Sequence, residues 1–335
     1  MTHLELVLWA GLTVGLVFGA CGQISGFCLQ RGLAEFWSGR HGYKLHSFTM
    51  ALAVALIGTD VLAATGAVDL SQSLYLMPSY SWLLLPLGGL MFGYGMSLAN
   101  GCGARALVLL GQGNLRSLVV LLCLGIAAYM TLTGILAPLR LWLGSLTAVT
   151  PGAVSVPAGL PRSVVVWLAA AMLLGFALRK RESGRRTSDL ISGVVVGLLI
   201  VAGWMVTGWL GADDFDPTPV TSLTFVAPIG DTIQYAMIAT GMSLRFGVAV
   251  VLGVVLGSFI ASLWRKQCCL EGFDTTRSMP RYIVGGLLMG VGGALAFGCS
   301  IGQGLTGLST LSYSSLIASL AIVAGARLNF KGRSA

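Results

Sequence analysis

The chain has 335 residues, of which 56% are hydrophobic and 10% are charged, with a formal net charge of +8. A soluble domain carries about 25% charged residues, so this composition excludes one, and continuous apolar runs exclude a β-barrel, whose strands would alternate. The basic residues gather in short loops between apolar runs, which is the pattern that orients membrane proteins and gives no indication of a nucleic-acid partner. The sequence therefore predicts an all-α polytopic membrane protein, one transmembrane domain over residues 1–335.

Nine apolar segments are candidates for transmembrane helices, and two of them are broken by glycines. The first segment is too long for a signal peptide and lacks a basic start or a cleavage site, so we expect it to remain as a span. In chain order the predicted spans are about 5–24, 45–66, 82–110 (broken), 115–136, 162–178, 190–210, 244–264, 282–310 (broken) and 313–328.

Two cysteines flank a glycine-rich weak point at the end of the first span. Cys21 and Cys28 lie on either side of Gly22 and Gly26, and Arg31 follows within one turn of Cys28. Glycine lets the chain leave helical backbone angles, so we expect the span to loosen here. Either cysteine is a candidate for a functional site, and the sequence leaves the choice between them open.

Asp60 is the one acidic residue well inside a predicted span. Ionisable side chains inside a membrane are unfavourable and are usually functional. The sequence leaves two interpretations of Asp60 open, a proton relay and a hydrogen bond to a neighbouring helix.

Both broken spans contain a cysteine between small residues at membrane depth. The first reads SLANGCGARALVLLGQG (97–113), and the second reads ALAFGCSIGQGLTGLST (294–310). We expect a half-helix to start at each break, with unpaired backbone N–H groups and a positive dipole end that attract an anion. A thiol adds a small polarisable group with a weak S–H donor. The predicted site residues at the two breaks are Gly101, Cys102, Gly103, Gly298, Cys299, Ser300 and Gln303.

The two breaks lie in an internal repeat. GGLMFGYGMSLANGC (88–102) and GGLLMGVGGALAFGC (285–299) are identical at nine of fifteen positions with a constant offset of 197 residues. The predicted topology brings the two copies in from opposite sides, which makes the repeat inverted, with broken helices or re-entrant loops meeting near the midplane. We place repeat unit one at about 1–136, connecting spans at 137–210 and repeat unit two at 229–328.

Charges in the loops orient the predicted spans. Loop 177–189 is strongly basic and is expected in the cytoplasm, whereas loop 211–228 carries three aspartates and no lysine or arginine and is expected outside. Alternation from these loops places the N-terminus outside and the C-terminus inside. Arg140, Arg162 and Arg245 fall on the outer side as exceptions.

The cysteine and histidine pattern argues against a metal centre and against an enzyme. Cys268 and Cys269 are adjacent, a spacing unsuited to chelation, and the three histidines lie at span ends. The chain has seven cysteines, and an odd number does not suggest a disulfide framework. A nucleophilic cysteine needs a base such as histidine, and the predicted spans place none at membrane depth. We expect no metal, no cofactor and no catalytic residue.

Three motifs together resemble the YeeE/YedE family of bacterial inner-membrane proteins over nearly the whole chain. They are SGFC at 25–28, NGCGARALVLLGQGNLRSL at 100–118 and FGCSIGQGLTGLS at 297–309. The resemblance implies a helical fold of about nine spans, with loops that dip to the membrane centre. It implies uptake of thiosulfate along three cysteines, of which Cys102 and Cys299 match by motif, with Cys28 as the counterpart in the first span. It also implies a multi-pass inner-membrane location and a small cytosolic sulfur carrier of the TusA type as a partner.

The sequence thus predicts a transporter that imports thiosulfate by passing it between thiols at the centre of the lipid bilayer. Each protonated thiol would offer its S–H to the anion, and weak serial donors would let the ion leave again. Two alternatives stay open at this point. One is transport of a related sulfur or selenium compound, and the other is a membrane sulfurtransferase in which one cysteine forms a persulfide.

Overall fold

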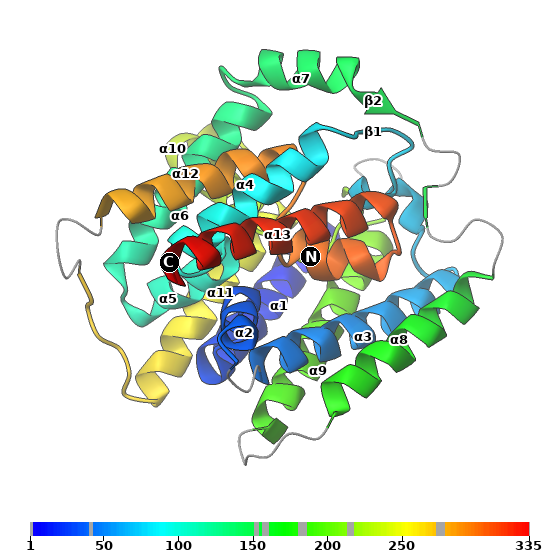
Figure 1. Ribbon diagram of the computed structural model, residues 1–335, viewed down its shortest axis with the longest axis horizontal. Coiled ribbons are helices and arrows are strands. Elements are labelled where there is room, and N and C mark those ends of the chain that lie inside the picture. The colour runs from blue at the N-terminus through cyan, green and yellow to red at the C-terminus, as the bar shows by residue number, and fades with distance from the viewer. Residues whose placement is uncertain are drawn as a thin grey trace.

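A computed structural model of the chain is built almost entirely from helices, with one short pair of antiparallel strands (Figure 1). It describes residues 3–39, 43–150, 154–155, 161–179, 186–212, 218–272 and 279–334. Within these residues, six helices are long and apolar enough to cross a membrane, and shorter apolar helices accompany them. The predicted all-α polytopic membrane protein is therefore confirmed, while the count of nine spans stays a prediction.

The helices that correspond to predicted spans begin and end close to the predicted bounds. They are α1 (His3–Ser25), α2 (Leu29–Trp37), α3 (Tyr43–Ala64), η1 (Leu70–Gln72), η2 (Leu74–Leu76), β1 (Tyr80–Ser81), α4 (Leu84–Leu98), α5 (Gly103–Gln112), α6 (Leu115–Leu132), α7 (Ala137–Leu146), β2 (Ala148–Val149), α8 (Arg162–Leu178), α9 (Arg186–Met205), η3 (Val206–Leu210), α10 (Val226–Ile238), η4 (Ala239–Gly241), α11 (Phe246–Trp264), α12 (Met279–Leu295), η6 (Gly302–Gly307) and α13 (Tyr313–Ser334).

Both predicted breaks are present. The third predicted span divides into α4 and α5, and the eighth divides into α12 and the π-helical turn η6. The short helices α2, α7 and α10 were not predicted, because each is too short to give a membrane-length apolar run. Residues 180–185 of the predicted basic loop and the aspartates 213, 214 and 216 of the predicted outer loop lie outside the described residues.

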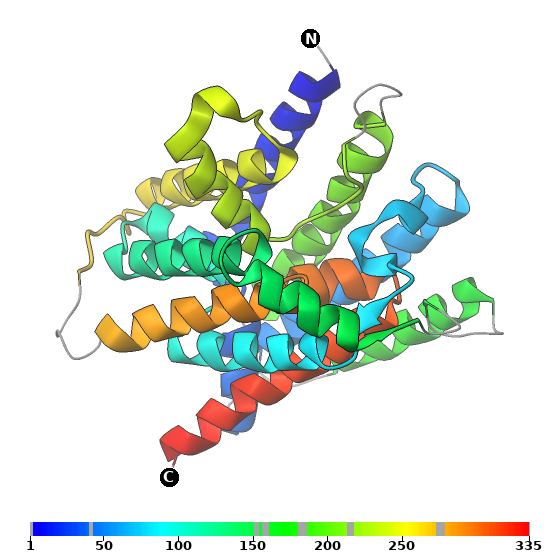
Figure 2. The same cartoon turned by 90° about the horizontal axis from the view of Figure 1, so that it is seen from above.

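The long helices pack in pairs around a buried centre. Helix α1 packs along α11 and α3 along α9, while α4 packs against both α12 and α13, and α6 packs against α12. Figure 2 shows α4, α6 and α12 running side by side, with α1 crossing them steeply. The largest buried side chains of the centre include Phe92, Phe225, Trp204 and Leu124.

Glycines allow the backbones of paired helices to come close together. A Cβ atom on Gly88 of α4 would lie 2.7 Å from the carbonyl oxygen of Gly292 in α12, and one on Gly95 would lie 2.7 Å from that of Gly285. A Cβ on Gly15 of α1 would collide with the carbonyl oxygen of Val250 in α11. Lipid tails provide no hydrophobic drive between helices, so close packing of small residues is what holds such pairs together.

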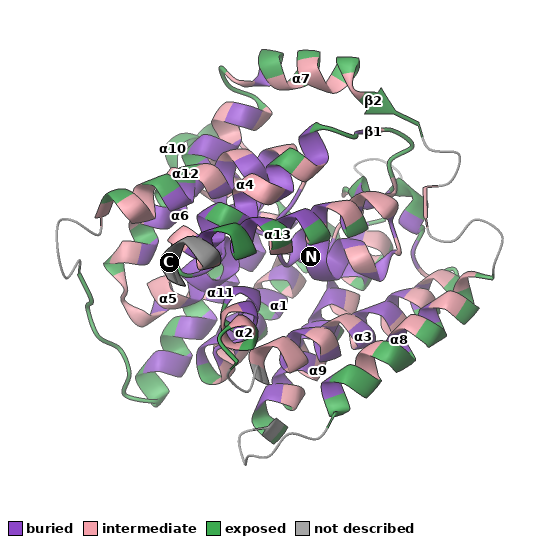
Figure 3. Cartoon of the chain, viewed as in Figure 1, coloured by how far each residue is buried: buried purple, intermediate pink, exposed green. Residues whose placement is uncertain are grey.

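The outer faces of the bundle are apolar and exposed (Figure 3). On α8 the side chains of Trp167, Leu168 and Met172 are between 57% and 71% exposed. Soluble monomers rarely expose apolar patches of this kind, whereas lipid covers them. The surface therefore agrees with a multi-pass membrane protein.

We predict that Gly15→Val destabilises the protein by about 1–3 kcal/mol, because the new side chain must force α1 and α11 apart. The measurement is thermal unfolding of the purified protein in detergent, followed by tryptophan fluorescence. Gly175→Val on α8 is the matched control, since a Cβ there meets no atom of the described residues within 4 Å. Equal unfolding temperatures for the two variants would show that the α1–α11 crossing is not closely packed.

Candidate functional site

The break before Cys102 is a helix end closed by a left-handed residue. Asn100 has φ +57°, and the N–H of Gly101 donates to the carbonyl of Met96 at 3.0 Å, which ends α4. Asparagine tolerates this conformation better than most residues. Cys102 then starts α5 as its N-cap, and its carbonyl accepts the N–H of Ala106 at 2.9 Å.

The break before Cys299 repeats this backbone pattern 197 residues later. Phe297 has φ +54°, and the N–H of Gly298 donates to the carbonyl of Gly293 at 2.9 Å. The carbonyl of Cys299 accepts the N–H of Gln303 at 2.7 Å. The N–H of Gly302 donates to the Cys299 sulfur at 3.2 Å, so a free backbone amide at the start of the next helical turn points at the thiol.

Cys28 also lies immediately before a helix. It is the N-cap of α2, it is 4% exposed, and its carbonyl accepts the N–H of Gly32 at 3.2 Å. Gly26, with φ +67°, lets the chain turn out of α1 just before it. Cys21 differs, because it lies within α1 and its thiol faces the carbonyl of Ser192 in α9, 3.9 Å away.

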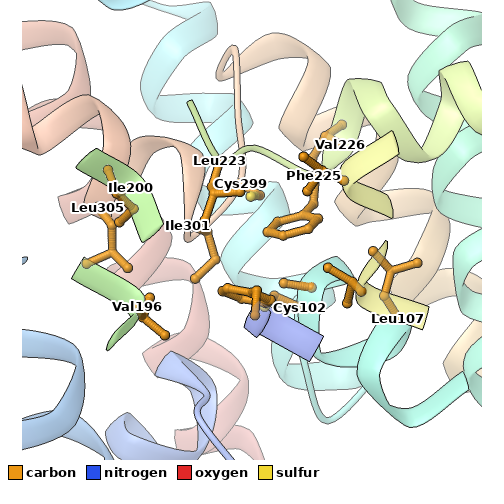
Figure 4. Packing of buried hydrophobic residues seen from close by; sticks show 14 of the residues in the cluster. Cys102, Leu107, Val196, Ile200, Leu223, Phe225, Val226, Cys299, Ile301 and Leu305 are labelled. Atoms are coloured by element: carbon orange, nitrogen blue, oxygen red, sulfur yellow. The ribbon is translucent and has the colours of Figure 1, made fainter. Parts of the chain in front are cut away.

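The fold brings Cys28, Cys102 and Cys299 together. Cys102 lies within electrostatic range of both of the other two thiols, and all three are buried. Their surroundings are apolar, and Figure 4 shows Cys299 beside the ring of Phe225, with Ile301 and Cys102 close by. All seven cysteines are free thiols, and within the described residues no group of three or more potential ligands could hold a metal ion.

The other predicted site residues lie at the same breaks. Gly101, Gly103 and Gly298 are buried. Ser300 is fully buried beside the Cys102 thiol. Gln303 is 1% exposed, its side-chain amide donates to the carbonyl of Ala296 at 2.6 Å, and its Oε1 accepts no hydrogen bond from the described residues. One polar side chain of the Cys299 break, that of Ser300, therefore lies beside the thiol of the other break.

A large cavity lies on the Cys299 side of the site. Its volume is about 1010 Å³, and its walls come from segments 71–78 and 218–224 and from the ends of α10 and α11, including Arg245. Hydroxyl groups are prominent in the walls: Ser71, Ser73, Thr218, Thr221, Ser222, Thr224 and Ser243. A Cβ on Gly302 would lie 2.7 Å from the Thr224 hydroxyl and 3.2 Å from that of Tyr75. Thr224, which lines the cavity, therefore lies close to the backbone that donates to Cys299, and the Tyr75 hydroxyl lies near the same glycine.

Basic side chains gather on the other side of the site, at the C-terminal end of α1. Lys44 donates to the carbonyl of Ser25 at 2.5 Å, Arg265 to that of Ile24 at 3.3 Å, and Arg105 to that of Gly22 at 3.1 Å. Cations at a helix C-terminus stabilise its dipole and its unpaired carbonyls. This cluster has no signal in the sequence, because its three cations come from three separate segments of the chain and only the fold brings them together.

Asp60 has an ionic partner. Its carboxylate lies 3.4 Å from the Nε of Arg162, the first residue of α8, and both residues are partly buried. The pair joins α3 to α8, which lies on the outside of the bundle (Figure 1). Of the two open interpretations, this contact favours a bond between neighbouring helices.

Comparison with known proteins places the site in context. A family described as "Sulphur transport" matches residues 24–328. The chain is 24% identical to a protein named thiosulfate transporter TsuA from Escherichia coli K12, over 95% of this chain and 92% of the relative. It is 26% identical to a thiosulfate transporter TsuA from Spirochaeta thermophila, over 95% of this chain and 97% of the relative. With its buried thiols and its multi-pass helical fold, the chain belongs to the sulphur transport family.

Proposed function

We propose that this protein imports thiosulfate into the cytoplasm, and that it acts as a transporter and not as an enzyme. One observation carries the proposal: three buried thiols, each just before a helical turn, meet at the centre of a chain whose relatives are named thiosulfate transporters. A cysteine that only fills space can lie anywhere along a helix, whereas each of these three lies immediately before a helical turn.

The proposed route begins at the large cavity. The ion passes the hydroxyls of Thr224 and Tyr75, then meets Cys299, Cys102 and Cys28 in turn. The lining of the cavity supports this order, since Thr224 forms part of its wall and also lies against Gly302, whose N–H donates to Cys299. Arg245 lies in the same wall and offers positive charge to an anion, although the carboxylate of Asp231 also lines the cavity.

The chemistry of the site suits this ion. Thiosulfate is a dianion with charged oxygens and one soft terminal sulfur. Protonated thiols contact the soft end as weak donors, and the backbone N–H groups at the helix starts hold the oxygens. Gly101, Gly103 and Gly298 keep the backbone accessible, while Ser300 and Gln303 add polar contacts between the two breaks. Sulfate lacks the soft sulfur, which gives the thiols a means of discrimination.

The repeat is proposed to be inverted, with broken helices that meet near the midplane. Two observations support this. Asn100 and Phe297 have nearly the same positive φ angle, and at each break the next glycine donates its N–H to the carbonyl five residues before it. The helix pairing also has a counterpart in each half: α1 packs on α11 as α9 packs on α3, and α6 packs on α12 as α13 packs on α4. This pairing favours starting the second unit at α9, earlier than residue 229, with α7 and α8 as the connection.

We further propose a multi-pass location in a bacterial inner membrane. The N-terminus lies in the periplasm and the C-terminus in the cytoplasm, so that the large cavity opens outward and the basic cluster around α1 faces inward. A small cytosolic sulfur carrier of the TusA type is the proposed partner that receives the sulfur compound. Lipid covers the exposed apolar faces of the helices, such as that of α8.

Removing a site thiol is expected to impair uptake. Cys102→Ala and Cys299→Ala should each lower the uptake of labelled thiosulfate into cells by roughly tenfold, which corresponds to losing about 1.4 kcal/mol of hydrogen bonding to the passing ion. Cys123→Ala is the matched control, because this half-buried thiol on α6 lies outside the three-thiol cluster. Normal uptake by both site variants at equal membrane levels would refute the thiol route.

The state of the thiols separates transport from sulfur transfer. A sulfurtransferase cysteine would attack the terminal sulfur of thiosulfate, form a persulfide and release sulfite. A thiol that only hands the ion on should remain free, so we expect alkylation and mass spectrometry after thiosulfate exposure to find unmodified Cys28, Cys102 and Cys299. Persulfide at any of them, with sulfite release, would favour the transferase, while uptake of selenium oxyanions by the intact protein would broaden the substrate class.

The ion pair of Asp60 with Arg162 predicts a structural role. Asp60→Asn should leave thiosulfate uptake within about twofold of the wild type, because the ion pair lies on the outside of the bundle, away from the thiols, and a partly exposed pair contributes only about 0–1 kcal/mol. Arg162→Gln should behave in the same way. If Asp60→Asn abolishes uptake while Arg162→Gln does not, the carboxylate has a function that the ion pair does not explain.

A further inference from the structure

Arg105 is a buried cation next to the site thiols. It lies in α5 one turn after Cys102, and it is 9% exposed. Its aliphatic stem lies over Gly101, where a Cβ would come within 3.2 Å of it. One of its guanidinium nitrogens donates to the carbonyl of Gly22 at 3.1 Å, which is its one side-chain hydrogen bond to the described part of the chain. Since a guanidinium has five N–H donors, most of them remain for another acceptor.

The charged neighbours of Arg105 do not neutralise it. Its guanidinium interacts electrostatically with Cys28, Cys102 and the second cation Arg31. Carboxylates form ion pairs elsewhere in the described residues, with Lys44 and Arg162, but none lies within 4 Å of Arg105. Buried arginines are normally paired, because desolvating an unpaired charge is unfavourable by several kcal/mol. Among the described residues, Arg105 therefore has free donors and no carboxylate partner, which leaves it able to bind an anion.

The position of Arg105 is also where the two breaks differ. With the offset of 197 residues, Arg105 corresponds to Gly302. Both backbone amides lie next to the thiol three residues before them, so the two sites share their main-chain geometry. At Gly302 the neighbouring polar groups are the hydroxyls of Thr224 and Tyr75, which carry no charge. Only the Cys102 break adds a guanidinium to this geometry.

We infer that Arg105 binds the oxygens of the transported sulfur oxyanion and orients the ion, so that its terminal sulfur faces Cys102 and Cys28. The inference rests on the proposed function and adds a residue to it. A guanidinium offers two parallel N–H donors that match two oxygens of a sulfonate group, whereas a thiol is a poor partner for charged oxygen. Arg31, exposed beyond Gly26, supplies a second positive charge on the side where the ion leaves.

Support for the end of α1 is the competing explanation for Arg105. Arg265 provides the matched control, because it also donates to a carbonyl in the last turn of α1, at 3.3 Å, but is exposed. If Arg105 served only to cap α1, the loss of Arg105 or of Arg265 would change the stability of the protein, and the affinity for the ion would stay the same. Substrate affinity therefore separates the two roles.

The experiment measures the concentration dependence of labelled thiosulfate uptake in proteoliposomes that contain the full chain. Arg105→Gln is expected to raise KM by roughly tenfold to a hundredfold, the effect of losing a charge-assisted hydrogen bond. Arg105→Lys keeps the buried charge but lacks the two-pronged donor, so its KM should lie severalfold above the wild type and below that of Arg105→Gln. Arg265→Gln should retain the wild-type KM. Thermal unfolding of each variant reports stability separately.

Each outcome decides the inference. A wild-type KM in Arg105→Gln, or in Arg105→Lys should the glutamine variant not fold, overturns it. Equal KM changes in Arg105→Gln and Arg265→Gln overturn it in favour of α1 capping. If the wild-type protein itself takes up no thiosulfate, the proposed function fails and the inference fails with it. If the wild-type protein takes up thiosulfate and the Arg105 variants have the wild-type KM, the role of Arg105 is refuted while the proposed function stands.

Discussion

The constraint on which this structure depends is that a broken helix exposes backbone N–H and C=O groups that lipid cannot satisfy. The molecule answers it by burying the cysteine and the preceding glycine at each break, and by closing each break with one left-handed residue and one backbone hydrogen bond to the carbonyl five residues back. The amides left over at the start of the next turn then point at a thiol, as the N–H of Gly302 does at Cys299. The position of the thiols is thus tied to the way in which the backbone hydrogen-bonding groups at the two breaks find their partners.

Much of this arrangement could be predicted from local sequence. Apolar run lengths located the spans, and the glycines around Cys102 and Cys299 located both breaks, because helix interruption is a local property. Choosing between Cys21 and Cys28 needed the fold, since the two residues are close in sequence and only Cys28 reaches the other thiols. Three-dimensional packing was also needed to find the Arg162 partner of Asp60, 102 residues away, and to place Arg105 against Gly22.

The two sides of the thiol cluster differ in chemistry. On the Cys299 side, serine and threonine hydroxyls line the cavity together with Asp231 and Arg245. On the Cys28 side, basic side chains from α3, α5 and α11 converge on the last carbonyls of α1. Two of these cations, Lys44 and Arg265, hold carbonyls at the end of α1, and Lys44 is also paired with Asp189. Arg105 is the one of the three that is buried next to the thiols.

The glycine contacts between α4 and α12 have a mechanical consequence. Gly88 lies against Gly292, and Gly95 against Gly285, so the backbones of α4 and α12 touch at two points along their crossing. Any movement of α4 away from α12 would have to part these backbones, with no side chains to keep them in contact as the gap widened. The contact between α4 and α12 therefore favours a rigid crossing of these two helices, since backbone atoms in van der Waals contact cannot move closer and lose their contacts when they separate.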